Sequence, residues 1–216
     1  MTLPPVQTRW LDRIGYEEAL ALQEQIVARK GEDPSAPDEF LLLEHEPVYT
    51  IGRTPDQSSL RDADLLPHPL VKINRGGQAT FHGPGQLVGY PILDLKLRGQ
   101  DLHRYLRALE EGLIDVLQRF EVTGERREGL TGVWVGNRKI ASIGVGVRRW
   151  ISMHGFALNV CGDLSPFRQI TPCGITGVEM TSVERECTRP VSVQEVADVS
   201  AIVFSQRFAD PQLGIR

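Results

Sequence analysis

The sequence predicts an α+β fold, a single domain in which helices flank a mixed β-sheet. Three observations lead to this prediction. The chain has 216 residues, a length that suits one domain. Helical patterns lie toward both ends of the chain, over residues 14–30 and from about 192 to 208. Several short strand-like runs, bounded by glycine and proline, lie between them, and this arrangement favours an α+β domain.

The first half of the chain contains one expected helix and several expected strands. Apolar residues in 14–30 recur with the spacing of an amphipathic helix, and Gly31 and the proline-containing segment after it end the pattern. Residues 53–69 are polar and interrupted by prolines, so we expect mostly loop there. The strand-like runs are residues 40–43, 48–51, 71–74 and 87–95.

The second half contains the clearest helical pattern. Leucine, valine and phenylalanine recur at steps of three and four over residues 101–120, which places an apolar stripe against a core. Ser192 and Glu195 have the spacing of a capping box, which predicts the start of the last helix. The expected strands are residues 133–135, 140–147 and 153–160. Gly136-Asn137 separates the first two of these strands, as in a β-hairpin.

Composition and charge exclude several classes of protein. The formal net charge is −4, and the first ten residues lack the basic and apolar regions of a secretory signal. The longest charge-free window near the first glycine cluster is too polar to span a bilayer. The three cysteines, Cys161, Cys173 and Cys187, form no Cys-x-x-Cys motif, so we expect neither a disulfide framework nor a zinc site. These features suggest a reducing, cytoplasmic location.

Residues 126–149 carry a net charge of +5 within this acidic chain. One interpretation is the solvated face of a hairpin. The other is a docking surface for acidic carrier domains, formed by Arg126, Arg127, Arg148 and Arg149. We do not expect nucleic acid to bind there, because the basic cluster is small and the whole chain is acidic.

Glycine is distributed unevenly, with 14 of the 21 glycines in residues 76–89 and 129–177. Glycine at this density weakens ordinary strands and helices, so we expect it to serve backbone geometry. In the run Arg75-Gly-Gly-Gln-Ala-Thr-Phe-His-Gly-Pro-Gly-Gln86, adjacent glycines would let a ligand approach the backbone closely. The spacing matches no common phosphate-binding motif, and a tight connection between strands remains the alternative.

Four side chains could carry chemistry. Cys173 lies in a Pro-Cys-Gly turn that would leave its sulfur accessible, although an inert buried thiol is the alternative. Lys139 shares a strand face with small apolar residues, where burial favours the neutral amine, unless the side chain reaches the surface. His82 and His154 suit a ligand site or a structural role, but not a metal site. This spacing suggests a cysteine enzyme with a lysine or histidine base.

Four strings taken together closely resemble the lipoyl(octanoyl) transferases, which move an octanoyl group from acyl carrier protein to a lysine of a lipoyl domain. The strings are residues 75–86, 132–144, 154–159 and 170–174, and the similarity covers about residues 40–185. The resemblance implies one acyltransferase domain over residues 1–216 with the catalytic fold of the biotin/lipoate protein ligases, acting as a monomer. It also implies the first step of protein lipoylation.

The resemblance further implies a role for individual residues. Cys173 resembles the nucleophile that carries the acyl thioester, and Lys139 the residue that lowers its pKa and exchanges protons. The backbone N–H groups near Gly76-Gly77 or Cys173-Gly174 would stabilise the developing oxyanion. The implied substrate-binding residues are Arg75, Gly76, Gly77, Gln78, Ala79, Thr80, Phe81, His82, Ser142, Ile143, Gly144, His154, Gly155 and Phe156.

The expected partners are acyl carrier protein and the lipoyl domains of 2-oxoacid dehydrogenase complexes or the glycine cleavage H protein, with no nucleic acid and no membrane. No ATP, metal or other cofactor is expected, because the substrate itself carries phosphopantetheine. The two glycine-rich windows would then form opposite walls of one acyl pocket.

Three other functions remain open at this point. An ATP-dependent lipoate–protein ligase of the same superfamily needs no cysteine, and its loop resembles His-Asp-x-Gly-Asn where this chain has His82-Gly-Pro-Gly-Gln86. A non-catalytic module that binds carrier proteins would use the basic segment, and a cysteine hydrolase would release free octanoate.

Overall fold

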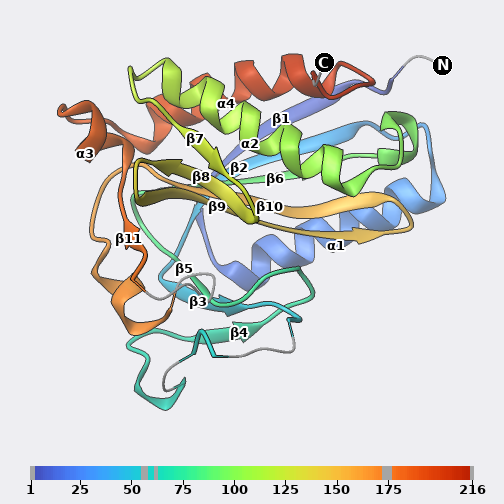
Figure 1. The fold of residues 1–216 in the computed structure, drawn as a ribbon. Coiled ribbons are helices and arrows are strands. Elements are labelled where there is room, and N and C mark those ends of the chain that lie inside the picture. The colour runs from blue at the N-terminus through green and yellow to red at the C-terminus, as the bar shows by residue number, and fades with distance from the viewer. Residues whose placement is uncertain (1–2, 55–57, 61–62, 172–176, 215–216) are drawn as a thin grey trace.

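The strands form two sheets, of which the larger crosses the centre of the molecule (Figure 1). The structure is a computed structural model and describes residues 3–54, 58–60, 63–171 and 177–214. Within these ranges the order across the larger sheet is β1 (Val6–Ile14), β2 (Asp38–His45), β6 (Gln86–Ile92), β10 (Ile151–Asn159), β9 (Arg138–Arg148), β8 (Leu130–Val135) and β7 (Glu125–Arg127). β11 (Glu179–Met180) also pairs with β9. The smaller sheet has the order β4 (Leu70–Lys72), β3 (Val48–Ile51) and β5 (Thr80–His82).

Helices cover both faces of the larger sheet (Figure 1). The α-helices are α1 (Tyr16–Glu32), α2 (Leu102–Gln118), α3 (Val183–Cys187) and α4 (Val193–Phe208), and the 3-10 helices are η1 (Ala63–Leu65), η2 (Leu95–Arg98) and η3 (Ser165–Gln169). α2 and α4 pack on one face, where they bury the main hydrophobic cluster, and α1 packs on the other. The smaller sheet lies beyond α1 and shares an apolar cluster with η3. No helix among the described residues is long and apolar enough to cross a membrane.

Local sequence explains why the longer helices form where they do. The Asp101 side chain accepts a hydrogen bond from the Arg104 N–H at 3.0 Å, and the Ser192 hydroxyl accepts one from the Glu195 N–H at 3.1 Å. Such caps satisfy backbone donors that have no partner within the helix. The apolar stripe of α2 is buried from Tyr105 onward except for the partly buried Leu106, so its predicted amphipathic packing is confirmed.

The first element of the chain differs from the prediction. We expected a helix first, but β1 precedes α1 and pairs in parallel with β2. The burial of β1 alternates only partly along its length, and pairing with β2 holds it in place. β5, β7, β11 and α3 were also not predicted. These elements are two to five residues long and form by tertiary pairing rather than by a local pattern.

Candidate active site

A pocket lies where the loop before β5 meets β9 and β10. We call it the central pocket. Its described lining comes from residues 75–82, 142–144 and 154–157, together with Tyr16 and Tyr90. The two glycine-rich windows therefore meet around one space, as the sequence analysis predicted.

Two of the expected binding residues do not line this pocket. The Gly76 N–H donates to the Val145 carbonyl at 3.0 Å and so ties the loop to β9. The Phe81 ring packs instead against Tyr49 and Phe167, in the apolar cluster under the smaller sheet. Both residues hold the loop in position, while the pocket itself is lined by their neighbours.

Arg75 forms one wall of the central pocket and is only 7% exposed. Its Nη2 donates to the Thr50 carbonyl at 3.2 Å and to the Thr50 hydroxyl at 3.0 Å, and its Nη1 donates to the Gly76 carbonyl at 2.9 Å. A Cβ on Gly144 would lie 2.8 Å from Cδ of Arg75. Only glycine therefore lets β9 pass this close to the arginine.

Hydrogen bonds fix the tautomer of His82. Its Nδ1 lies 2.8 Å from Oε1 of Gln86, an acceptor, so Nδ1 carries the proton. Its Nε2 lies 3.3 Å from the Thr50 hydroxyl, which can then donate to it. Burial, aided by the neighbouring His45 and Arg75, lowers the pKa of His82 to about 3. The ring is therefore neutral at pH 7 and holds the Thr50 hydroxyl toward Arg75.

Tyr16 and Tyr90 line the pocket although the sequence analysis did not single them out. Their hydroxyls share a hydrogen bond, and the Tyr90 hydroxyl lies 2.7 Å from Nε2 of His45. Burial raises the pKa of Tyr16 to about 12 and that of Tyr90 well above its ordinary value. Both hydroxyls therefore remain protonated donors. Tyr16 begins α1, and its place in a helical pattern gave no signal that it faces a ligand site.

His154 lies in the pocket wall on β10 with a left-handed backbone, φ 56°. It is 2% exposed, and neither ring nitrogen has a hydrogen-bond partner among the described residues. Its backbone N–H donates to Oε1 of Gln23 on α1 at 2.8 Å. Burial, with the nearby Arg75 and Arg53, lowers the pKa of His154 to about 4.

A series of buried hydrogen bonds connects the pocket to the strand that carries Lys139. Nε2 of Gln86, the residue bonded to His82, donates to Oδ1 of Asn159 at 2.9 Å. Nδ2 of Asn159 donates to the Thr181 carbonyl at 3.0 Å. The Thr181 N–H in turn donates to the Lys139 carbonyl at 3.0 Å. Neither Gln86 nor Asn159 was expected to serve the site.

The Lys139 side chain is buried, at 1% exposure, so it does not reach the surface. Its Nζ donates to the Thr131 carbonyl at 3.0 Å and lies 5.3 Å from the centre of the Trp134 ring. A Cβ on Gly132, where φ is 127°, would lie 2.8 Å from Cε of the lysine, so glycine gives this side chain its space.

Cys173, the expected nucleophile, lies outside the described residues. Cys161 is half-buried, and its N–H donates to the Gly85 carbonyl at 2.9 Å. Cys187, at the end of α3, is also half-buried. Within the part of the chain that the structure describes, no three His, Cys, Asp or Glu side chains group closely enough to hold a metal ion.

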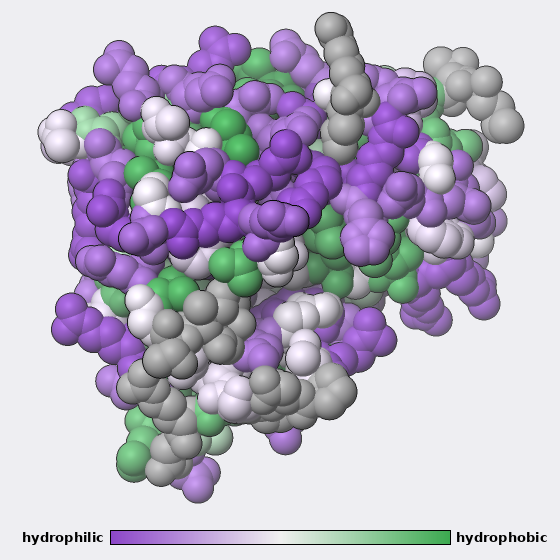
Figure 2. Space-filling model, in the orientation of Figure 1, coloured by the Kyte–Doolittle hydropathy of each residue, from purple (hydrophilic) through white to green (hydrophobic). Residues whose placement is uncertain are grey.

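The basic residues of segment 126–149 lie toward the two ends of β9, and their role in docking carrier domains stays a prediction. Arg138 and Arg148 are the two ends of β9, which are about 33 Å apart in a straight strand of this length. Arg126 and Arg127 lie near the Arg138 end, where Arg126 and Arg138 each pair with a glutamate and Arg127 donates to a carbonyl of the β8–β9 turn. Arg149 follows β9 at the other end. Hydrophilic side chains form a broad band on the face in Figure 2.

Comparisons with known proteins extend this picture. Residues 15–205 match the family profile of the lipoyl protein ligase A/B catalytic domain. The octanoyltransferase of Geobacter sulfurreducens is 53% identical over 195 residues, which cover 90% of this chain and 81% of that protein.

Two solved structures show the same fold. The bipartite lipoate protein ligase of Thermoplasma acidophilum superposes with a TM-score of 0.71 at 16% identity, covering 95% of this chain and 84% of that one. The biotin protein ligase of Aquifex aeolicus superposes with a TM-score of 0.55 at 12% identity, covering 94% and 70%. The predicted fold class is confirmed. With a profile match over most of its length and a relative of 53% identity, the chain belongs to the lipoyl protein ligase A/B catalytic domain family.

Proposed function

We propose that this chain is an octanoyltransferase that moves an octanoyl group from acyl carrier protein, through a thioester on Cys173, to a lysine of a lipoyl domain. One observation carries the proposal: residues 75–82, 142–144 and 154–157 converge on one pocket, and a chain of hydrogen bonds ties that pocket to Lys139. The name of the Geobacter sulfurreducens relative supports the same reaction.

In the first half-reaction, the Cys173 thiolate attacks the carbonyl carbon of the carrier thioester. A free thiol has a pKa of about 8.5, and a nearby ammonium favours its thiolate. The tetrahedral intermediate collapses with loss of the pantetheine thiolate, which takes a proton from the Lys139 ammonium. The developing oxyanion needs N–H donors. Gly76 is not one of them, because its N–H already donates to Val145, whereas Gly77 lines the pocket.

In the second half-reaction, the amine of the acceptor lysine attacks the Cys173 thioester. Lys139, now neutral, accepts the proton that the attacking amine loses. The C–S bond breaks, an amide forms and the Cys173 thiolate returns. Exchange between two thioesters is nearly isoenergetic and amide formation is favourable, so the reaction requires no ATP and, as we propose, no metal or other cofactor.

The central pocket suits an acyl chain because backbone forms much of its wall. Gly77, Gly144 and Gly155 present no side chain to the space, while the Phe156 ring provides apolar surface. We further propose that residues 1–216 act as one domain and as a monomer in the cytoplasm, with lipoyl domains of 2-oxoacid dehydrogenase complexes or the glycine cleavage H protein as acceptors.

An assay with purified components tests this proposal. Octanoyl acyl carrier protein is incubated with an unmodified lipoyl domain, without ATP, and both proteins are followed by mass spectrometry. We expect the lipoyl domain to gain one octanoyl group with the unsubstituted enzyme. We expect Cys173→Ala to abolish transfer, a loss of at least about 1000-fold. Without acceptor, the enzyme itself should gain an octanoyl group on Cys173.

The other outcomes identify the alternatives. Transfer that needs free octanoate and ATP with Mg²⁺ would make the chain a ligase. Release of free octanoate would make it a hydrolase, and binding of carrier protein without turnover would make it a carrier-binding module. Cys161→Ala is the matched control and should retain transfer, since this half-buried cysteine lies outside the described lining of the central pocket.

A further inference from the structure

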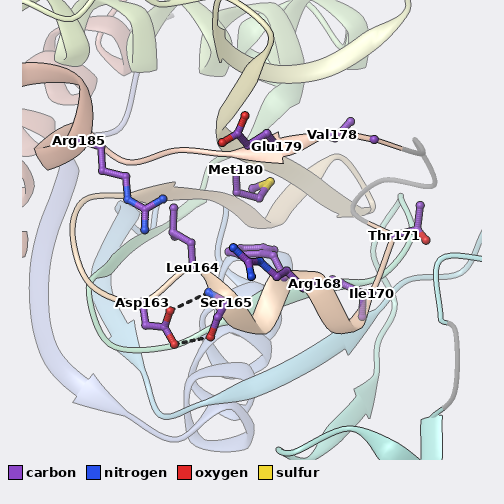
Figure 3. A pocket seen from close by; sticks show the side chains of 12 residues that line it. Asp163, Leu164, Ser165, Arg168, Ile170, Thr171, Val178, Glu179, Met180 and Arg185 are labelled. Carbon is purple, nitrogen blue, oxygen red and sulfur yellow. Dashed lines mark hydrogen bonds between the residues drawn. The ribbon is translucent and has the colours of Figure 1, made fainter.

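A second cavity, which we call the η3 cavity, lies between η3, β11 and α3 (Figure 3). It has a volume of about 490 Å³. Leu164, Phe167, Ile170 and Met180 give it an apolar base, and these residues belong to the cluster beneath the smaller sheet. Polar side chains line the rest of it.

Two arginines extend into the η3 cavity from different elements. Arg168 lies on η3 and Arg185 on α3, and Figure 3 shows both side chains directed toward the cavity. Neither guanidinium forms an ion pair or a hydrogen bond with another described residue, whereas Arg138 and Arg189 in the same region each pair with a glutamate. Unpaired guanidinium groups from two elements are well suited to bind an anion in a bidentate manner.

Two carboxylates also line the cavity, those of Asp163 and Glu179. Asp163 accepts hydrogen bonds from the Ser165 N–H at 2.8 Å and from the Ser165 hydroxyl at 2.5 Å. These bonds, with the nearby Arg185 and Arg168, lower the pKa of Asp163. The Glu179 carboxylate points away from Arg168 in Figure 3. The guanidinium groups therefore keep hydrogen-bond donors for a ligand.

Two residues close to Cys173 in the sequence line the η3 cavity. Thr171 and Gly177 are the described residues that precede and follow this cysteine most closely in the chain. A donor thioester must bring its sulfur to this cysteine while the rest of its arm lies outside the central pocket. A surface with an apolar base and cationic side chains matches the far end of the arm, where a branched apolar dimethyl group lies next to the phosphate.

We propose that the η3 cavity binds the 4′-phosphopantetheine arm of the acyl donor, with the phosphate between Arg168 and Arg185. This assignment rests on the proposed function, because it takes the donor to be an acyl thioester of a carrier. The apolar base contacts the branched, apolar part of the arm. The arginines recognise the phosphate, and the protein surface of the carrier is not needed for this contact.

Two small donors that differ only in the phosphate test the proposal. S-octanoyl-4′-phosphopantetheine and S-octanoyl-pantetheine are compared as donors for octanoylation of a lipoyl domain. We expect the unsubstituted enzyme to favour the phosphorylated donor about tenfold in kcat/KM, through KM, which one charge-assisted hydrogen bond provides. In Arg168→Gln/Arg185→Gln the preference should fall to about twofold or less, with activity toward the unphosphorylated donor unchanged.

Arg148→Gln/Arg149→Gln is the matched control, because it removes the same charge at the far end of β9 and should keep the preference. An equal preference in the enzyme and in the η3-cavity variant would overturn the proposal. So would a loss seen only with intact carrier protein, which would assign the arginines to acidic side chains of the carrier. If no donor supports transfer, the proposed function fails. In that case calorimetry still tests the cavity. Tighter binding of 4′-phosphopantetheine than of pantetheine would show that the cavity binds phosphate, and equal affinities would overturn the proposal.

Discussion

Three buried histidines lie around the central pocket: His45, His82 and His154. Burial is the largest cause in each case, and it lowers their pKa values to about 4, about 3 and about 4. Neutral rings have one donor and one acceptor nitrogen, so the hydrogen bonds of His45 and His82 have a fixed direction. The pocket wall keeps this polarity at neutral pH because none of the three rings is charged there.

These shifts predict acid sensitivity of the fold. A folded-state pKa below the unfolded value of about 6.5 means that the unfolded chain binds more protons as the pH falls. The free energy of unfolding should therefore decrease between about pH 6.5 and pH 4, by about 2 kcal/mol per histidine at pH 5. His154→Asn, which tolerates the left-handed backbone, should reduce the decrease between pH 7 and pH 5 by that amount.

Urea unfolding at the two pH values measures this difference. His103→Asn is the control, since His103 is exposed on α2 and its replacement should leave the pH dependence as it is. An identical pH dependence in His154→Asn and the unsubstituted chain would contradict the assignment of His154.

Single residues were predicted from the sequence to different extents. The family resemblance predicted that Lys139 and Arg75 belong to the site. Spacing alone did not decide whether the Lys139 side chain is buried or reaches the surface. Tyr16 and Tyr90 were missed because they lie 74 residues apart in the chain and meet only when α1 packs under β6. A local pattern cannot report such a meeting, since it holds no information about which elements pack together.

Elements with strong local patterns were predicted well. The helices α1, α2 and α4 follow apolar periodicity, α2 and α4 also begin at capping residues, and the β8–β9 hairpin follows its Gly-Asn turn. β1 and β11 were not predicted, because each is defined by its partner strand rather than by its own residues. β11 matters for the site, since its pairing beside Lys139 closes the hydrogen-bond series from His82.

The hydrogen bond between the Gln86 and Asn159 side chains predicts that their effects on stability are energetically coupled. Their side chains connect β6 to β10, and Asn159 continues to β11. Asn159→Leu removes the partner of the Thr181 carbonyl and one of the two acceptors of Gln86 Nε2, so it should destabilise the fold by about 1–3 kcal/mol. It should also slow acylation of the enzyme about tenfold, because Thr181, whose N–H donates to the Lys139 carbonyl, loses its hydrogen bond to Asn159.

A double-mutant cycle separates this bridge from two independent effects. Gln86→Leu, Asn159→Leu and the double variant are compared by urea unfolding and by single-turnover acylation. We expect a coupling free energy of about 0.5–3 kcal/mol. Strict additivity in both measurements would show that the two side chains act separately.

A buried ionic cluster links both helical layers to the larger sheet. Asp38 on β2 pairs with Nζ of Lys30 at 2.7 Å and with Nη2 of Arg98 at 2.8 Å, and all three side chains are at most 1% exposed. Arg98 also donates to the Phe208 carbonyl at the end of α4. The cluster therefore joins α1, the larger sheet, η2 and α4, so both helical layers depend on one carboxylate.

Asp38→Asn should destabilise the fold more than the loss of any exposed pair. Removing the carboxylate leaves two buried cations without a counter-charge, which costs about 3–5 kcal/mol. Because Lys30 lies on the helix that begins with Tyr16, partial loosening of α1 should also raise KM for the acyl donor. Urea unfolding and donor KM measure the two effects. Glu195→Gln, which removes the exposed Arg189–Glu195 pair, is the control and should change neither. Equal, small losses of stability in both variants would show that the cluster does not hold the layers together.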